Sequence, residues 1–225
     1  KAEKAKEMRK EADELTKDFL KAIFMEMFGD RKGLKKIKLG DVASFRMGGT
    51  PENSEINSSF AKIPWIKGSD LEKEYIYSAN NFITQKGMDN SRAIYYEPGT
   101  VLIGRAGQGK TRGTTAILNF KATTNETVIA IFPNRAEITP EYIHFNLKFR
   151  YQELRDIAGD NTRGGITQTD LTNLEFYLPP LPLQQKFASI VKEVESMKEQ
   201  QKHSKDQIYN LFNALMQKAF KGELI

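Results

Sequence analysis

The C-terminal part of the chain, residues 181–221, carries an apolar repeat that constrains the fold more than any other feature. The repeat advances by alternating steps of three and four residues, the heptad pattern of helices that pack against other helices. Pro182 suits the first helical turn and Gly222 suits the end. Because a long helix gains most of its stability from packing, we expect it to have a partner helix. The repeat consists of Phe187, Ile190, Val194, Met197, Ile208, Leu211 and Leu215, with the polar residues Gln201 and Ser204 at two positions in its middle.

Residues 1–28 are a candidate partner, because they are charged, free of Gly and Pro, and periodic. Gly29-Asp30 is predicted to end this helix. The two stretches are expected to pack antiparallel, either within the chain or across a dimer. Their ends also resemble each other, which indicates either an internal repeat or shared helix composition. The apolar positions of the first stretch are Ala5, Met8, Ala12, Leu15, Phe19 and Ala22.

Residues 31–180 differ from both helical stretches. Gly, Pro, Asn and Thr recur every few residues, and the β-branched and aromatic runs between them predict short strands. One helix is expected from Pro140 to about Ile157, and a short capped helix over Thr167–Leu171. The predicted fold class is α+β: a globular mixed α/β domain whose long N- and C-terminal helices form an antiparallel coiled coil. The expected strands are Ile63–Lys67, Thr100–Gly104, Thr114–Leu118, Val128–Phe132 and Glu175–Leu178.

Composition excludes several classes of protein. The chain has no cysteine, which rules out disulfides and thiolate zinc sites, and its two histidines, His144 and His203, give little support to any metal site. No apolar run is long enough to span a membrane, and the charged N-terminus does not resemble a signal peptide; the absence of cysteine fits the cytoplasmic location that is expected. The net charge of +5 favours a polyanionic partner only mildly.

Residues 104–111, Gly-Arg-Ala-Gly-Gln-Gly-Lys-Thr, match the P-loop pattern of nucleotide-binding proteins. A P-loop leads into a helix, whereas the residues at 112–117 have low helix propensity and high strand propensity. No later apolar strand ends in an Asp that would hold magnesium. The sequence therefore favours a Gly-rich loop between two strands over a nucleotide site, with a solvated basic turn as the alternative. Its polar side chains are of types that contact base edges and phosphates: Arg105, Gln108, Lys110 and Arg112.

Three further segments carry weaker patterns. Residues 48–51, Gly-Gly-Thr-Pro, and residues 159–165 read as further polar loops, which turn composition alone also explains. Residues 178–181, Leu-Pro-Pro-Leu, only approach the signature of amino-methyltransferases. Leucine cannot bond the target amino group or stack on a flipped base, so methyl transfer by this chain is not expected.

Taken in order, several segments resemble one known family. They are Leu39-Gly40-Asp41-Val42 with Gly48-Gly49-Thr50-Pro51, Ile63-Pro64-Trp65-Ile66-Lys67, Gly99-Thr100-Val101-Leu102-Ile103 with the Gly-rich loop, Asn125-Glu126 near the family's usual Asn-Gln, Leu178-Pro179-Pro180-Leu181-Pro182-Leu183-Gln184-Gln185-Lys186, and Ala219-Phe220-Lys221-Gly222-Glu223-Leu224. The match is collinear over roughly residues 35–225. Together, these segments resemble the type I restriction-modification DNA specificity subunit.

The resemblance implies an organisation as well as a function. Such subunits carry two recognition domains separated by two long antiparallel helices, and each domain reads one half of a split DNA site. The helices set the spacing and recruit methyltransferase subunits, which bind S-adenosylmethionine; a restriction subunit is a further partner. This chain would then bind no cofactor and catalyse no reaction. Residues 1–30 would be the spacer helix, 31–180 the recognition domain and 181–225 the distal helix.

One departure from the family leaves more than one interpretation open. A single recognition domain is present where the typical subunit has two, so the chain is either one half of a subunit or a natural half-subunit that forms a homodimer. It could instead be the recognition domain of a larger single-chain restriction-modification enzyme; a P-loop nucleotide-binding protein is less favoured. The residues expected to contact DNA are Thr50, Lys67, Arg105, Gln108, Lys110, Arg112, Asn161, Arg163 and Gln168. Those expected in helix–helix contacts are Leu15, Phe19, Phe187, Ile190, Val194, Met197, Ile208, Leu211 and Leu215.

Overall fold

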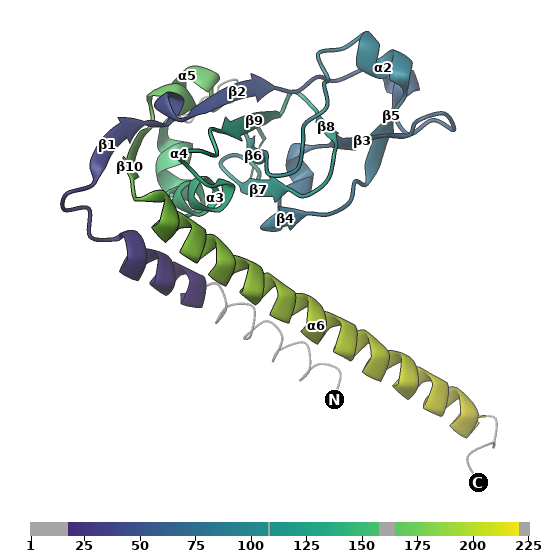
Figure 1. The fold of residues 1–225 in the computed structure, drawn as a ribbon. Helices are drawn as coiled ribbons and strands as arrows, with labels where there is room; N and C mark the ends of the chain where they lie inside the picture. The colour runs from purple at the N-terminus through teal and green to yellow at the C-terminus, as the bar shows by residue number, and fades with distance from the viewer. Residues whose placement is uncertain (1–17, 108, 158–164, 221–225) are drawn as a thin grey trace.

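A five-stranded sheet forms the centre of the domain in the computed structural model, which describes residues 18–107, 109–157 and 165–220 (Figure 1). Neighbouring strands are antiparallel except β4 and β7, which are parallel. In sheet order, the strands are β2 (Ala43–Met47), β9 (Val128–Pro133), β6 (Val101–Gly104), β7 (Thr115–Leu118) and β4 (Tyr75–Ile76). The mixed α+β architecture predicted from the sequence is confirmed.

Both faces of this sheet are covered, because successive side chains of a strand point to opposite faces. Val101 and Ile103 of β6 join one apolar cluster, and Leu102 between them joins another. The first cluster contains residues of α3 (Pro140–Phe149), α5 (Gln168–Asn173) and the terminal helices, while the second contains Ile66 and Leu71. Burial on both faces explains why β6 reads in the sequence as a continuous apolar run.

Two smaller sheets complete the domain. One has the strand order β5 (Asn81–Ile83), β3 (Ile63–Ile66), β8 (Thr123–Thr124), and α2 (Gln85–Asp89) follows β5. The other pairs β1 (Lys35–Lys38) with β10 (Glu175–Leu178), and so joins the start of the domain to its end. The short 3-10 helices are η1 (Leu39–Asp41), η2 (Asn53–Glu55) and η3 (Gly68–Asp70).

The single helix predicted over residues 140–157 is two helices, α3 and α4 (Tyr151–Ile157). The chain leaves helical geometry at Arg150, with φ −102° and ψ 20°. The Arg150 guanidinium there donates to the Glu175 carbonyl of β10 at 2.8 Å. The predicted start is confirmed, with Pro140 in the first turn and Thr139 as the cap. The short helix is also confirmed, because Thr167 and Asp170 form a capping box on α5.

The long C-terminal helix α6 (Leu181–Phe220) extends away from the domain, and the helix of residues 18–28 lies beside its first turns with the opposite chain direction (Figure 1). The rings of Phe24 and Phe28 each lie 5.4 Å from the ring of Phe187 on α6. Phe24 also stacks on Tyr142 of α3, with the ring centroids 5.8 Å apart. The terminal helices are therefore fixed to the domain by an aromatic cluster.

The buried face of the first helix differs from the predicted one. Leu20, Phe24 and Phe28 are buried, whereas Phe19 is 52% exposed. Apolar residues occupy almost every face of the helix over residues 19–28, so periodicity alone permits burial of either the Phe19 face or the Leu20 and Phe24 face. Contact with Phe187 selects the second. On α6, Phe187 and Val194 are buried and Ile190 packs against the core, but Met197 is 59% exposed. Partner contacts by Phe19 and Met197 remain predictions.

The rest of the expected coiled coil lies outside the part of the chain whose side chains the structure describes. Leu15 lies outside the described residues, and so do the side chains of Ile208, Leu211 and Leu215. The antiparallel coiled coil thus remains a prediction beyond the first turns of α6. Among the described residues, no helix is both long enough and apolar enough to cross a membrane.

Candidate nucleic-acid interface

The Gly-rich loop joins β6 to β7, which pair antiparallel, as the sequence predicts. Gly104 N donates to Thr114 O at 2.9 Å and Gly113 N donates to Gly104 O at 2.8 Å, and these bonds close the base of the loop. Gly113 has a φ of +83°, a conformation that favours glycine. After Thr111 the chain turns back into a strand instead of entering a helix. The loop therefore lacks the helix N-terminus that a P-loop uses to bind phosphate.

Helix α4 holds the outer part of this loop from one side. Tyr151 donates its hydroxyl to Lys110 O at 3.1 Å, and the Arg155 guanidinium donates to Gly109 O. The side chain of Lys110 is exposed. Because its backbone is fixed by α4, Lys110 presents its ammonium group to solvent from a defined position. Arg112 is half-buried, and Gln108 lies outside the described residues.

The segment ahead of α5 lies against the Gly-rich loop. Ile166 N donates to Arg105 O at 2.9 Å, and Arg105 Nε donates to Ile166 O at 3.4 Å. A Cβ atom at Gly165 would lie only 2.4 Å from Arg105 O, so a side chain there would separate the two segments. Gln168, the first residue of α5, is exposed nearby in the chain. Asn161 and Arg163 lie outside the described residues.

The loop at Gly48-Gly49 is attached to the same region. Gly48 N donates to Val128 O at 3.2 Å, and Gly49 N donates to Thr124 O at 2.9 Å. A Cβ atom at Gly48 would lie 2.3 Å from two backbone oxygens, so glycine is required for this close approach. Thr50, which follows, is exposed.

Trp65 links this loop to the predicted Lys67 position. The indole Nε1 of Trp65 donates to Gly49 O at 3.0 Å, and the Lys67 ammonium lies 5.5 Å from the centre of the indole ring. The next residue, Gly68, is close enough to the Gly-rich loop that a Cβ atom would lie 2.8 Å from Thr111 Cγ2. The structure thus brings Thr50 and Lys67 into one connected set of segments with Arg105 and Lys110.

The Gly-rich loop, the Gly48 loop and the segment before Lys67 meet at a tight turn, residues 125–128, between β8 and β9. Asn125 N donates to Ile66 O at 3.0 Å, and Arg105 N donates to Thr127 O at 2.9 Å. Sequence reasoning used Asn125-Glu126 only as a mark of resemblance and missed this turn as the place where the loops join. An Asn that begins a turn between two strands was the available signal. Exposed Arg92, whose backbone packs on Gly49, was also missed.

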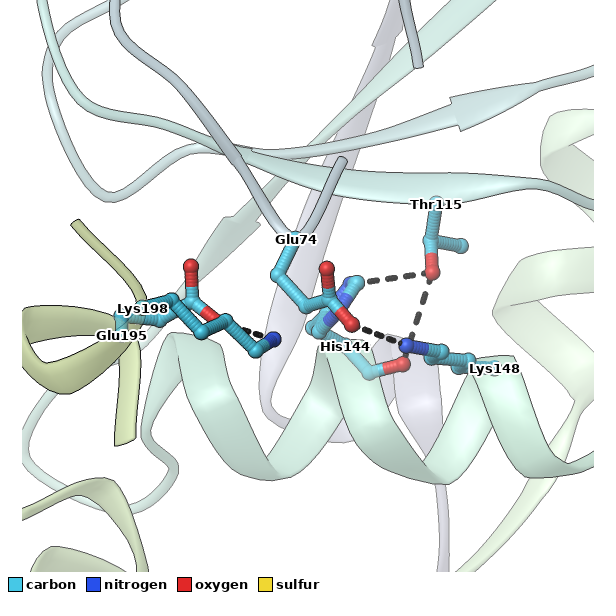
Figure 2. Close-up of polar contacts among 6 residues, drawn as sticks. All are labelled: Glu74, Thr115, His144, Lys148, Glu195 and Lys198. Atoms are coloured by element: carbon cyan, nitrogen blue, oxygen red, sulfur yellow. Dashed lines mark hydrogen bonds and ion pairs between the residues drawn. The ribbon is translucent and has the colours of Figure 1, made fainter. Parts of the chain in front are cut away.

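A separate polar cluster lies between α3, β7, the start of β4 and α6 (Figure 2). His144 is 1% exposed, and its Nδ1 lies 3.0 Å from Thr115 Oγ1. Burial, reinforced by the nearby Lys148, lowers the pKa of His144 to about 3. This histidine is therefore neutral at physiological pH and packs inside the domain.

Glu74 is paired in the same cluster. Its carboxylate binds the Lys148 ammonium at 2.5 Å, and Figure 2 shows Lys198 of α6 close by, bonded to Glu195. Burial alone would raise the pKa of Glu74, but Lys148 together with Lys198 lowers it to about 2. The cluster is a set of compensated charges to which Lys198 of α6 contributes through its charge. Among the described residues, no group of three His, Asp or Glu side chains could hold a metal ion.

Comparisons with known proteins agree on one family. The model of the type I restriction modification DNA specificity domain matches residues 31–210. The chain is 24% identical over 160 residues to the type I restriction enzyme MjaIX specificity subunit of Methanocaldococcus jannaschii, covering 71% of this chain and 37% of that protein. It is 23% identical over 146 residues to the type I restriction enzyme EcoR124I/EcoR124II specificity subunit of Escherichia coli, and this match covers 64% of this chain and 36% of that protein. The chain thus spans little more than a third of the length of these curated relatives.

Solved structures share the fold. A chain from work on complex assembly and conformational transition of the type I R-M system gives a TM-score of 0.64 at 23% identity, covering 98% of this chain and 55% of that one. The HsdS subunit from Thermoanaerobacter tengcongensis gives a TM-score of 0.61 at 21% sequence identity, and the match covers 99% of this chain and 55% of that subunit. With the family model matched over most of its length and the fold shared with these subunits, the chain belongs to the type I restriction modification DNA specificity domain family.

Proposed function

We propose that this chain reads one half of a split DNA site within a type I restriction-modification complex. The observation that carries the proposal is the convergence of three segments at the 125–128 turn, with a fourth, the segment ahead of α5, bonded to one of them at Arg105. The loops bring exposed or half-buried polar side chains onto one connected framework: Thr50, Lys67, Arg105, Lys110, Arg112 and Gln168. Loops held by a rigid scaffold are where binding residues are expected.

Within the Gly-rich loop, we assign two kinds of contact. Arg105 and Gln108 read base edges, because Arg and Gln make paired hydrogen bonds with guanine and adenine. The bond from Arg105 Nε to Ile166 O supports this role, since it orients a guanidinium that carries further N–H donors on its Nη atoms. Lys110 and Arg112 mainly neutralise phosphates, a role that suits the exposed ammonium of Lys110. Asn161 and Arg163 are proposed as further contacts.

The terminal helices would set the spacing between half-sites and recruit methyltransferase subunits, with a restriction subunit as a further partner. The aromatic cluster of Phe24, Phe28 and Phe187 supports this role, because it fixes the direction of α6 relative to the recognition loops. S-adenosylmethionine and catalysis would then belong to the partner subunits. A second recognition domain would come from the same polypeptide or, in a homodimer, from a second copy.

The test compares two alanine variants of the complete protein, assembled with its methyltransferase, in fluorescence titrations on cognate and one-base-changed duplexes at several salt concentrations. Arg105→Ala is expected to cost about 1–3 kcal/mol on the cognate site and to relax discrimination at one base pair. Lys110→Ala is expected to weaken binding to every sequence and to reduce the salt slope by about one unit. If both variants bind both duplexes as the wild type does, the Gly-rich loop does not face DNA.

A further inference from the structure

Glu126 is an acidic residue on the turn at which the loops of the proposed recognition surface converge. Its side chain is exposed at the second position of the 125–128 turn. Residues on both sides of it are bonded to the converging loops: Thr124 O accepts from Gly49, and Thr127 O accepts from Arg105. A duplex that contacts Thr50 and Arg105 together would therefore pass over Glu126.

The turn holds Glu126 in a defined position. Val128 N donates to Asn125 O at 3.2 Å, which closes the turn. The Asn125 side-chain oxygen accepts from Thr127 N at 3.2 Å and from Thr127 Oγ1 at 2.7 Å. Asn125 is itself buried, 8% exposed, and its backbone N–H donates to Ile66 of β3. These bonds fix the backbone from which the exposed Glu126 side chain extends.

A carboxylate at this place is unfavourable for binding phosphate, because it repels the DNA backbone that Lys110 attracts. A contact in which it accepts a hydrogen bond from a base edge would offset that repulsion. An ionised carboxylate offers acceptors only. In the major groove, cytosine presents the N4 amino group as a donor, whereas the adenine N6 donor lies beside the N7 acceptor, which repels a carboxylate.

We propose that Glu126 is a specificity-determining residue that reads the amino group of a cytosine in the half-site. The inference rests on the proposed function, since it requires that the converging loops face DNA. It adds a residue and a base: one C·G pair at the position nearest the 125–128 turn. Glu126 would supply discrimination rather than affinity, in contrast to the cations around it.

The experiment selects bound duplexes from a randomised half-site library, with the complete protein in complex with methyltransferase subunits. Wild type, Glu126→Gln, Glu126→Ala and the control Glu193→Gln are compared, with thermal unfolding confirming that each is folded. Glu193 is exposed on α6 and loses the same charge away from the turn. Glu126→Ala is expected to reduce the preference for cytosine at one position by about 5- to 150-fold. Glu126→Gln is expected to shift that position toward adenine, since an amide both donates and accepts.

The outcomes separate the two proposals. If the wild type selects no sequence, the proposed function fails. If the wild type selects a half-site and both Glu126 variants select the same one, the proposed function stands and the role of Glu126 is overturned. It is equally overturned if Glu126→Gln tightens binding to all sequences alike, because the carboxylate would then act only as a repulsive charge. Glu193→Gln is expected to leave the selected half-site unchanged.

Discussion

Lowering the pH should destabilise the domain through His144, and the structure sets the size of the effect. The ordinary imidazole pKa is 6.5, and in the folded protein burial lowers the pKa of His144 to about 3. Between these values the unfolded chain binds a proton that the folded chain does not. A lowered folded-state pKa contributes stability that is complete above the unfolded pKa and is lost as the pH falls. The affected window therefore extends from about pH 6.5 downward.

At pH 5.0 the unfolded imidazole is almost fully protonated while the folded one is neutral. Relative to pH 7.5, this difference removes about 2 kcal/mol of unfolding free energy, and the value does not depend on the folded pKa as long as it lies well below 5. The pKa of Glu74 is lowered from 4.5 to about 2, so Glu74 acts in the same direction but mainly below pH 4.5. The loss between pH 7.5 and 5.0 thus isolates His144 within this cluster.

The assay is urea unfolding followed by circular dichroism at pH 7.5, 6.5, 5.5 and 5.0 for wild type and His144→Gln. The variant is expected to be less stable at pH 7.5, because it disturbs a buried site, but to lose about 2 kcal/mol less than the wild type on going to pH 5.0. His203→Gln, which removes the other histidine of the chain, is the matched control. Parallel pH profiles for wild type and His144→Gln would refute the reasoning.

Three further predictions test the packing and the loops. Phe187→Ala should lower the free energy of unfolding in urea by about 3–5 kcal/mol, because Phe187 is fully buried among aromatic rings. Met197→Ala, at an exposed position of the same helix, should change it by less than about 0.5 kcal/mol. Equal effects would contradict the buried face described for α6. Gly165→Ala should push the Arg105 segment away and lower discrimination between cognate and altered duplexes in fluorescence titration; wild-type discrimination would mean that this contact does not position Arg105. Calorimetric titration with ATP should give no binding, and ATP binding that disappears in Lys110→Ala would restore the P-loop interpretation.

Features that depend on neighbours in the sequence could be predicted. The heptad pattern after Pro182 predicted α6, and the Thr167 capping signal predicted α5. The apolar runs on either side of the Gly-rich loop predicted the β6–β7 pair, and the residues after Lys110 excluded a following helix. Collinear segments identified the family. Each of these depends on local propensity or spacing, which a single sequence records directly.

Other features were decided only by tertiary contacts. Leu20 and Phe24, rather than Phe19, are buried because Phe187 and Tyr142 lie on that side. Helix α3 ends at Arg150, where the guanidinium meets a carbonyl of β10. Propensity could not predict these outcomes, because each partner is more than twenty residues away in the chain.

The site divides in the same way. Residue types indicated Arg105 and Lys110, but nothing local indicated that the Gly48 and Lys67 segments would meet the Gly-rich loop at the 125–128 turn, or that Ile166 would bond to Arg105. That meeting depends on backbone hydrogen bonds between distant segments, for which every residue other than proline carries the same donor and acceptor. The sequence by itself therefore determined which loops are chemically suited to DNA. Only the folded chain determined that these loops lie together and that the turn with Glu126 lies between them. The reason is that backbone hydrogen bonds join groups that are the same in nearly every residue, so the amino-acid sequence does not show which segments will pair.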